Sequence, residues 1–327
     1  MAESQFQKFN HLKIHSQYSI CEGAVKIDDL KDFSKDEKIK SFGICDTTNL
    51  CGALEFAEKI SKVGTQPVIG TQINFKFENT IGLLPLYALD EKGYKRIIEL
   101  SSFSYLENEI PTEPHLDFNK LLNKNDGIAV FSGTIHGLFG QLFDKGKFSE
   151  IKDLYSKLKL NFSDRFYIEI QRHGDQNEKI FEKFNLSKSY ELKIPLIATN
   201  EVFYINKEMH DAHDALICIK NKTYVNEKNR IRFSDQHYLK NDIEMKELFS
   251  DLPEALENNY NFPYRCSFKP LFSKPILPNI SSEKGGNADE TLRLNSLNGL
   301  KEKFINHFNL SKKDFLKDKN FLKYKDR

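Results

Sequence analysis

The sequence of 327 residues has no tryptophan, and its five cysteines form no Cys-x-x-Cys pair. An odd count without such pairs argues against a disulfide framework, so we expect reduced and mostly buried thiols. No apolar run approaches about 18 residues, and the polar N-terminus has no hydrophobic signal region. We therefore expect no signal peptide and no membrane span, and we expect a cytoplasmic protein.

The sequence also lacks a large excess of charge of either sign. The formal net charge is +1 at pH 7, so the chain as a whole is not expected to bind nucleic acid by electrostatics alone. Residues 301–327 nevertheless hold nine Lys or Arg and four Asp or Glu, a net charge of +5, which leaves −4 for residues 1–300. A solvated basic helix is the simpler interpretation of this end, and a piece of a larger DNA-binding unit is the alternative.

Strand-like and helix-like patterns alternate over residues 11–219. Short apolar runs predict strands at 11–14, 42–45, 68–69, 83–89, 128–131, 166–170 and 195–198. Apolar residues at intervals of three to four positions predict helices at about 27–33, 50–60, 94–100 and 148–160, from 178, and at 209–219. This β/α order predicts a parallel sheet, and roughly seven strands without a Gly-rich phosphate loop favour a closed barrel over a doubly wound sheet.

The composition changes near residue 270. Pro270, Pro275 and Pro278 punctuate an extended passage, residues 281–286 are typical of a linker, and helical periodicity resumes at 291–308. We expect a barrel domain over residues 1–279 and a linker with a short helical extension over residues 280–327. The charged end has no C-cap signal, so we also expect the natural chain to continue past Arg327.

The ends of the predicted strands carry the residues that chemistry would need. Asp46 ends the strand 42–45, and barrel enzymes place their catalytic groups at such strand ends. Lys13 and His15 are two residues apart and therefore share one face of the first strand. A His-x-His pair would clamp a metal there, but a protonated lysine cannot coordinate a cation. A lone histidine on a strand is more often a hydrogen-bonded core residue than a ligand.

Other polar and aromatic groups give weaker signals. A cluster at 210–214 contains two histidines and two aspartates, and a polar helix face near the barrel rim explains it better than a metal site. His136 is expected to be a loop residue. Tyr18, Phe103 and Tyr105 are not interleaved with basic residues, so they give no support for base stacking.

Several motifs occur in a characteristic order. They are Phe-Asn-His-Leu-Lys-Ile-His-Ser-Gln-Tyr-Ser-Ile-Cys at 9–21, Asp-Thr-Thr-Asn-Leu-Cys-Gly-Ala at 46–53, Glu-Ile-Gln-Arg-His-Gly at 169–174, and Ala-Thr-Asn-Glu-Val at 198–202. Together they resemble the polymerase and histidinol phosphatase (PHP) domain, in the form found at the N-terminus of bacterial DNA polymerase III alpha subunits. The resemblance covers nearly the whole chain. It implies a distorted seven-stranded (β/α) barrel, with residues 280–327 as a linker and the start of a polymerase core.

In active members of this family, side chains at the strand ends hold metal ions that hydrolyse phosphoester bonds. The resemblance implies ligands at nine positions of this sequence, and four of these positions hold side chains able to ligate: His15, Asp46, His173 and Glu201. The other five hold Lys13 and Thr47 in place of histidines, Gln72 in place of an acidic residue, Thr134 in place of a cysteine or histidine, and Phe203 in place of a histidine.

We interpret this set as a vestigial metal site. Dehydrating divalent ions requires several anionic or imidazole ligands, and threonine or glutamine oxygens are weak substitutes. Our hypothesis is that the ammonium of Lys13 replaces the metal and pairs with Asp46 or Glu201, because a buried carboxylate without a counter-charge is costly. The alternative is one residual Zn or Mg ion on His15, Asp46 and His173.

By resemblance, such a domain is a structural scaffold that can dock the separate proofreading exonuclease subunit, with no catalytic residue or cofactor of its own. The whole protein would be a DNA-directed DNA polymerase, a nucleotidyltransferase of DNA replication whose Mg²⁺-binding carboxylates lie beyond Arg327. Its partners would be DNA, the remainder of the polymerase chain and other replicase subunits. Two alternatives stay open: an active metal-dependent phosphoesterase or 3′–5′ exonuclease, and an unrelated protein that reuses the barrel.

Overall fold

Residues 8–108, 113–123, 125–275, 287–308 and 319–325 are described by the computed structural model. The chain divides into two units, Met1–Phe272 and Ser273–Arg327. The predicted boundary between residues 279 and 280, and the predicted linker at 281–286, lie outside the described residues. The division into a barrel domain and a polymerase-core start therefore stays a prediction.

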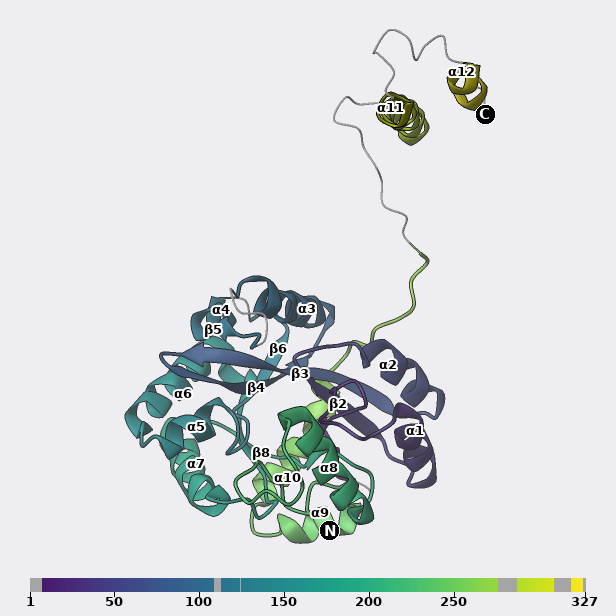
Figure 1. The fold of residues 1–327 in the computed structure, drawn as a ribbon. Helices are drawn as coiled ribbons and strands as arrows, with labels where there is room; N and C mark the ends of the chain where they lie inside the picture. Colours follow the sequence, from purple (N-terminus) through teal and green to yellow (C-terminus); the bar gives the residue numbers. More distant parts are fainter. Residues whose placement is uncertain (1–7, 109–112, 124, 276–286, 309–318, 326–327) are drawn as a thin grey trace. The chain divides into compact units, whose positions relative to one another are not determined.

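A single curled sheet forms the centre of the first unit (Figure 1). Its hydrogen-bonded order is β8-β7-β6-β4-β3-β2-β1-β9, with β5 beside β3. Thr199 and Asn200 alone separate β8 from β9 in the chain, so the two ends of this order lie close together and the sheet curls into a half-barrel. The described strands are β1 (Lys13–Ile14), β2 (Ser41–Thr47), β3 (Gln66–Phe77), β4 (Thr80–Ala88), β5 (Leu116–Asp117), β6 (Ile128–Phe131), β7 (Phe166–Ile170), β8 (Leu196–Ala198) and β9 (Glu201–Val202).

The predicted α/β class is confirmed, but the predicted all-parallel order was wrong at β4. This strand runs antiparallel to both β3 and β6, whereas the other pairs in the sheet are parallel. Only Glu78 and Asn79 connect β3 to β4, and a connection this short returns the chain antiparallel, since a parallel crossover needs a dozen or more residues. The described sheet also has nine strands instead of seven, because the two-residue strands β5 and β9 leave no apolar run in the sequence.

Helices cover the outer face of the curl (Figure 1). On that face, side chains such as Ile44 and Ile69 pack with Phe56 and Ile60 of a helix, while Tyr87, on the inner face, belongs to another apolar cluster. This inner cluster fills one end of the curl, so polar side chains gather toward the carboxyl ends of the strands. The described helices of this unit are α1 (Ile27–Asp36), α2 (Ala53–Lys62), α3 (Glu91–Leu106), α4 (Phe118–Asn123), α5 (Leu138–Asp144), α6 (Phe148–Phe162), α7 (Glu178–Leu192), α8 (His210–Asn221), α9 (Asp242–Leu248) and α10 (Pro253–Asn261).

The second unit contains α11 (Ala288–Phe308) and α12 (Lys319–Lys325). The rings of Phe304 and Phe321 meet edge to face, with centroids 5.6 Å apart, and they form a small apolar cluster between the two helices. The helix predicted at 291–308 is thus confirmed. In the described parts of both units, no helix combines the length and apolar character that a membrane crossing requires.

His11 ties the residues just before β1 to the segment before α9. Its Nε2 lies 2.9 Å from the carbonyl oxygen of Lys240, which can only accept, so this nitrogen carries the proton. The ring is 2% exposed, and burial lowers the pKa of His11 to about 4. The imidazole is therefore neutral in the folded protein near pH 7.

We predict that this buried imidazole makes stability depend on pH. The unfolded chain protonates a histidine near pH 6.5 but the folded chain does so only near pH 4, so the unfolded state binds more protons between these values. The free energy of unfolding should therefore fall on acidification, with His11 contributing a loss of about 2 kcal/mol between pH 7 and pH 5. His11→Gln, which can still donate to the Lys240 carbonyl, should remove this contribution in urea titrations. An unchanged pH slope in that variant would contradict the prediction.

Candidate functional site

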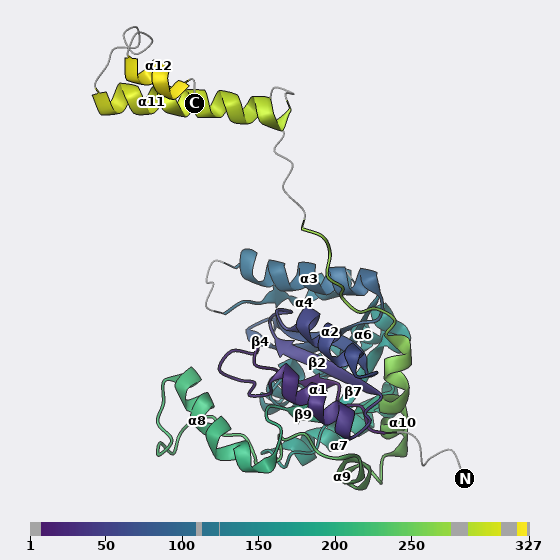
Figure 2. The same cartoon turned by 90° about the vertical axis from the view of Figure 1, so that its right-hand side faces the viewer.

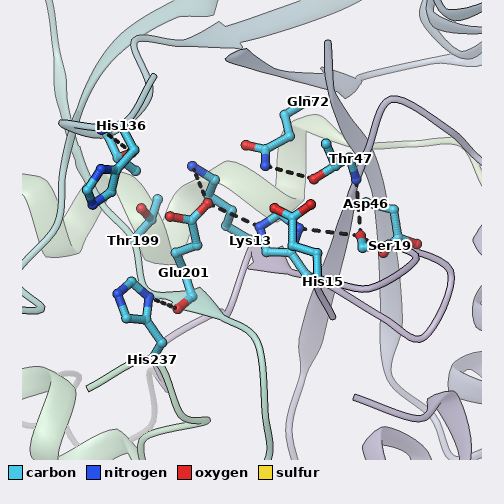
Figure 3. A network of polar contacts seen from close by, with 12 residues as sticks. Lys13, His15, Ser19, Asp46, Thr47, Gln72, His136, Thr199, Glu201 and His237 are labelled. Carbon is cyan, nitrogen blue, oxygen red and sulfur yellow. Dashed lines mark hydrogen bonds and ion pairs between the residues drawn. The ribbon is translucent and has the colours of Figure 1, made fainter. Parts of the chain in front are cut away.

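A buried group of charges lies where the strand ends meet (Figure 3). Lys13 of β1 is directly opposite Glu201 of β9 in the parallel register, which places their side chains next to each other. The Nζ atom of Lys13 lies 3.0 Å from Oε1 of Glu201 and 4.0 Å from Oε1 of Glu169, in β7. All three residues are at most 5% exposed, so this is an ion pair removed from water.

The electrostatics of this group keep Lys13 and Glu201 charged. Burial alone would lower the pKa of Lys13, but the carboxylates of Glu169 and Glu201 outweigh it and raise the pKa above its ordinary value. Burial would raise the pKa of Glu201, but the Lys13 charge and the hydrogen bond with His15 hold it well below its ordinary value. An ammonium and a carboxylate therefore face each other at neutral pH, which confirms one of the two expected pairings of Lys13.

His15 and Phe203 complete the surroundings of the Glu201 carboxylate. His15 Nε2 lies 3.1 Å from the same Oε1 atom that Lys13 contacts, so this ring nitrogen already has a partner. The His15 ring stacks on the ring of Phe203, with centroids 4.7 Å apart and planes at 25°. Phe203, which stands where the resemblance implies a histidine, thus packs an apolar face against the imidazole.

Among the described residues, no side-chain cation pairs with Asp46, so the alternative pairing of Lys13 with Asp46 was wrong. Its Oδ1 accepts hydrogen bonds from the backbone N–H of Ser16 at 2.7 Å and from Oγ of Ser19 at 2.6 Å, and its Oδ2 accepts from Oγ of Ser16 at 2.8 Å. Burial raises the pKa of Asp46, and the hydrogen bonds from Ser19 and Ser16 partly oppose this. The buried carboxyl group of Asp46 therefore has its hydrogen bonds from the backbone and hydroxyl groups of the loop after β1.

Thr47, Gln72 and Thr134 place neutral groups around the charged centre. Gln72 Nε2 donates to Thr47 Oγ1 at 3.0 Å, and Thr134 Oγ1 accepts from the backbone N–H of His136 at 3.1 Å. A cavity of about 90 Å³ opens beside them, and its polar lining includes side chains from three strands and the loop after β6: Lys13, Gln72, Thr134, His136 and Glu201. The structure thus brings together residues that are scattered over most of the barrel sequence.

His173 lies in the same polar layer, and its Nε2 atom is engaged. Asn200 Oδ1 lies 3.0 Å from this nitrogen, and the backbone N–H of Glu201 approaches it at 3.2 Å. Whichever tautomer the imidazole takes, Nε2 has a partner: it donates to the amide oxygen or accepts from the backbone. The ring also stacks on that of His237, with centroids 4.0 Å apart.

Three side chains of the site, Glu169, Asp175 and His237, were not assigned from the sequence, and His136 was expected only as a loop residue. Glu169 was quoted only as part of a motif, although β7 places it on the same face as Tyr167, which packs inward. Asp175 Oδ2 lies 3.0 Å from Nε2 of His136 and 3.4 Å from Nε2 of His237. Burial and the neighbouring His173 lower the pKa of His237 to about 4. His237 lies in an irregular segment, and nothing in the sequence indicated its position.

These side chains do not fit a divalent metal ion. A multinuclear site needs several anionic or neutral imidazole ligands that converge on the ion. Here the ammonium of Lys13 binds the carboxylate a cation would need, and hydroxyl groups already hold Asp46. Among the described residues, no group of three or more His, Cys, Asp or Glu side chains is arranged to hold a metal ion.

Comparisons with known proteins agree with this architecture. Residues 11–173 match the PHP domain family, and this part of the chain belongs to that family. The chain is homologous to the N-terminal region of DNA polymerase III alpha subunits, as its motifs predicted: it is 34% identical over 314 residues to that of Caulobacter vibrioides and 36% identical over 286 residues to that of Rickettsia conorii. These alignments cover 92% and 86% of the chain but only 27% and 24% of the relatives, so the chain spans about a quarter of their length.

A likeness to solved structures is weaker. A two-domain protein from Bacteroides vulgatus, described as containing a predicted PHP-like metal-dependent phosphoesterase, has 13% sequence identity and a TM-score of 0.37. The alignment covers 73% of this chain and 62% of that one. At this score the likeness carries no argument about the site.

We predict that removing one partner of the buried pair is much more damaging than removing both. Lys13→Met leaves Glu201 charged and buried, and the free energy of unfolding should fall by about 3–5 kcal/mol. Lys13→Met/Glu201→Gln should recover a large part of this loss, with a coupling energy of about 2 kcal/mol in a double-mutant cycle from urea unfolding.

Lys62→Met is the matched control, because the ion pair of Lys62 with Glu58 is well exposed, at 66% and 42% of the two side chains. It should change stability by no more than about 0.5 kcal/mol. Additive effects of Lys13→Met and Glu201→Gln, or an effect of Lys13→Met as small as that of the control, would refute the buried pair.

Proposed function

We propose that this chain acts as a non-hydrolytic PHP module of a replicative DNA polymerase alpha subunit. The observation that carries the proposal is the buried contact between Lys13 and Glu201. A cationic side chain held 3.0 Å from the carboxylate does the charge-balancing that a metal would do, but it cannot polarise a phosphate as a Lewis acid or activate a bound water. The module would then contribute a stable structural support to the larger subunit.

The whole protein, in this proposal, is a DNA-directed DNA polymerase of the cytoplasm. The support is the homology with DNA polymerase III alpha subunits over 92% of this chain. Nucleotidyl transfer with Mg²⁺, contact with DNA and assembly with other replicase subunits would belong to that larger protein. None of the nine vestigial positions would take part in nucleotide addition.

We also propose that the barrel docks the separate proofreading exonuclease subunit. A module that has lost its own hydrolysis cannot excise a wrongly added nucleotide, so this task would fall to another subunit held close by. The rigid curled sheet and its surrounding helices supply a large preformed surface for such contact.

The alternative function is an active metal-dependent phosphoesterase or 3′–5′ exonuclease. The PHP family match and the retained His15, Asp46, His173 and Glu201 favour it. Against it stand the partners these groups already have: Glu201 binds Lys13, serine hydroxyls bind Asp46, and Asn200 binds His173. A metal would have to break all three arrangements.

We predict that the purified chain holds well below one equivalent of Zn, Mn or Mg after gel filtration, measured by mass spectrometry of the metals. It should not cleave a single-stranded oligonucleotide when these metals are added. The matched control is Lys13→His/Thr47→His/Gln72→Glu/Phe203→His, which restores imidazole and carboxylate groups and should raise the metal content. Stoichiometric metal in the unaltered chain, with EDTA-sensitive cleavage lost in His173→Ala, would establish the alternative instead.

We predict that the chain and the exonuclease subunit encoded in the same genome co-elute as a stoichiometric complex in size-exclusion chromatography. The same complex should form with Lys13→His/Thr47→His/Gln72→Glu/Phe203→His, since Lys13, Gln72 and Phe203 line the cavity and the half-buried Thr47 contacts Gln72. Separate elution at concentrations of each protein well above the micromolar range would refute docking by this chain and leave the metal-site proposal standing.

A further inference from the structure

Residues 219–232, at the end of α8 and in the loop after it, form a projecting segment that we call the basic arm. Figure 2 shows α8 and this loop standing away from the curled sheet. The arm holds five Lys or Arg and one Glu, a net charge of +4, although the whole chain has a net charge of only +1. Its large apolar side chains are also exposed, and Tyr224 is 74% exposed.

Internal contacts fix the shape of the arm. Arg230 forms a two-pronged ion pair with Asp214 of α8, with N–O distances of 2.5 and 2.6 Å, and its side chain is only 4% exposed. The same guanidinium donates to the carbonyl oxygen of Val225 at 3.1 Å. Glu227 accepts a hydrogen bond from the backbone N–H of Tyr224 at 3.1 Å. The loop is therefore braced by polar contacts of Arg230 and Glu227.

The base of the arm is tied to the barrel. His213 Nε2 lies 2.9 Å from the carbonyl oxygen of Glu22, and Lys220 Nζ lies 3.1 Å from the carboxylate of the same residue. The polar face predicted for the cluster at 210–214 is thus partly buried, since His213 and Asp214 are 2% and 6% exposed. Lys220 and Arg230 are thus already paired with acidic side chains of the same chain, Glu22 and Asp214.

Three cations of the arm stay available to a partner. In the described parts of the chain, no acidic side chain lies within ion-pair distance of Lys222, Lys228 or Arg232. These side chains are exposed, and the exposed ring of Tyr224 lies between the first two in sequence. Asn221, Asn226 and Asn229 add exposed amide groups to the same stretch. Such residues supply the common contacts to phosphate and sugar oxygens.

We propose that the basic arm binds single-stranded nucleic acid. Lys222, Lys228 and Arg232 contact backbone phosphates, and a base stacks on the exposed ring of Tyr224. Cations without internal partners attract any polyanion, but the aromatic ring interleaved with them and the exposed amides favour a strand with bases over an acidic peptide. This binding does not depend on the state of the metal site, so the two proposals fail or stand separately.

The test is the anisotropy of a labelled oligo(dT) of about 20 nucleotides titrated with the 327-residue chain. Three phosphate contacts predict that affinity falls about 20-fold when salt rises from about 50 to about 200 mM. Lys222→Gln/Lys228→Gln/Arg232→Gln should weaken binding at least about ten-fold and flatten the salt dependence. Tyr224→Ala should weaken binding about ten-fold and leave the salt slope unchanged. An oligo(U) of the same length shows whether the strand recognised is DNA or RNA.

The matched control is Lys157→Gln/Lys179→Gln/Lys183→Gln, which removes the same charge from exposed positions of α6 and α7. It should bind oligo(dT) within about two-fold of the unaltered chain, and circular dichroism should show every variant folded. The proposal is overturned by absence of binding at low salt, or by a control that weakens binding as much as the arm variant. It is also overturned if poly-glutamate of equal charge displaces the oligonucleotide fully, because the arm would then recognise an acidic protein.

Discussion

The buried contact between Lys13 and Glu201 is the interaction on which the rest of the site depends. The parallel register of β1 and β9 places the two side chains opposite each other, at the point where the ends of the curled sheet meet. Without the ammonium, the carboxylates of Glu201 and Glu169 would lie in the same dry space with no counter-charge. Desolvated like charges are among the most costly arrangements in a protein, so this lysine determines which neighbours the site can have.

The sequence predicted the elements well wherever the packing leaves a long apolar pattern. β6 and β7 lie at the residues predicted for them, because each is a short apolar run that is buried along its whole length. α7 begins at the predicted Glu178. The predicted direction of β4 was wrong. The β/α alternation predicted a parallel strand, but the two-residue connection after β3 makes β4 antiparallel. β5 and β9 are paired by their neighbours and have too few residues to show a period, so only the folded sheet reveals them.

The site was predictable in its positions and less so in its contacts. The family resemblance implied the nine expected positions, but it did not indicate which side chains satisfy one another. Asp46 shows the reason: the hydroxyl groups of Ser16 and Ser19, from a loop that turns back over the strand end, take the place expected for a cation. His237 meets His173 across 64 positions of sequence, in a stretch with no regular pattern. Such pairings arise from the fold and leave no local signal.

Charged side chains have two different roles in this protein. The buried charges of the barrel support the structure, and the exposed charges of the basic arm are proposed to bind a partner. Inside the barrel, Lys13, Glu169 and Glu201 act as a unit in which loss of the ammonium leaves buried carboxylates uncompensated. A buried ion pair is rarely more stable than apolar packing of the same volume. What makes this pair important is that removing either partner leaves the other charge buried without compensation. On the arm, Arg230 is satisfied internally and fixes the loop, while neighbouring Lys222, Lys228 and Arg232 have no such partner among the described side chains. The buried, paired charges stabilise the barrel. The exposed charges of the arm, which have no such pairs among the described side chains, are the ones that a partner can bind.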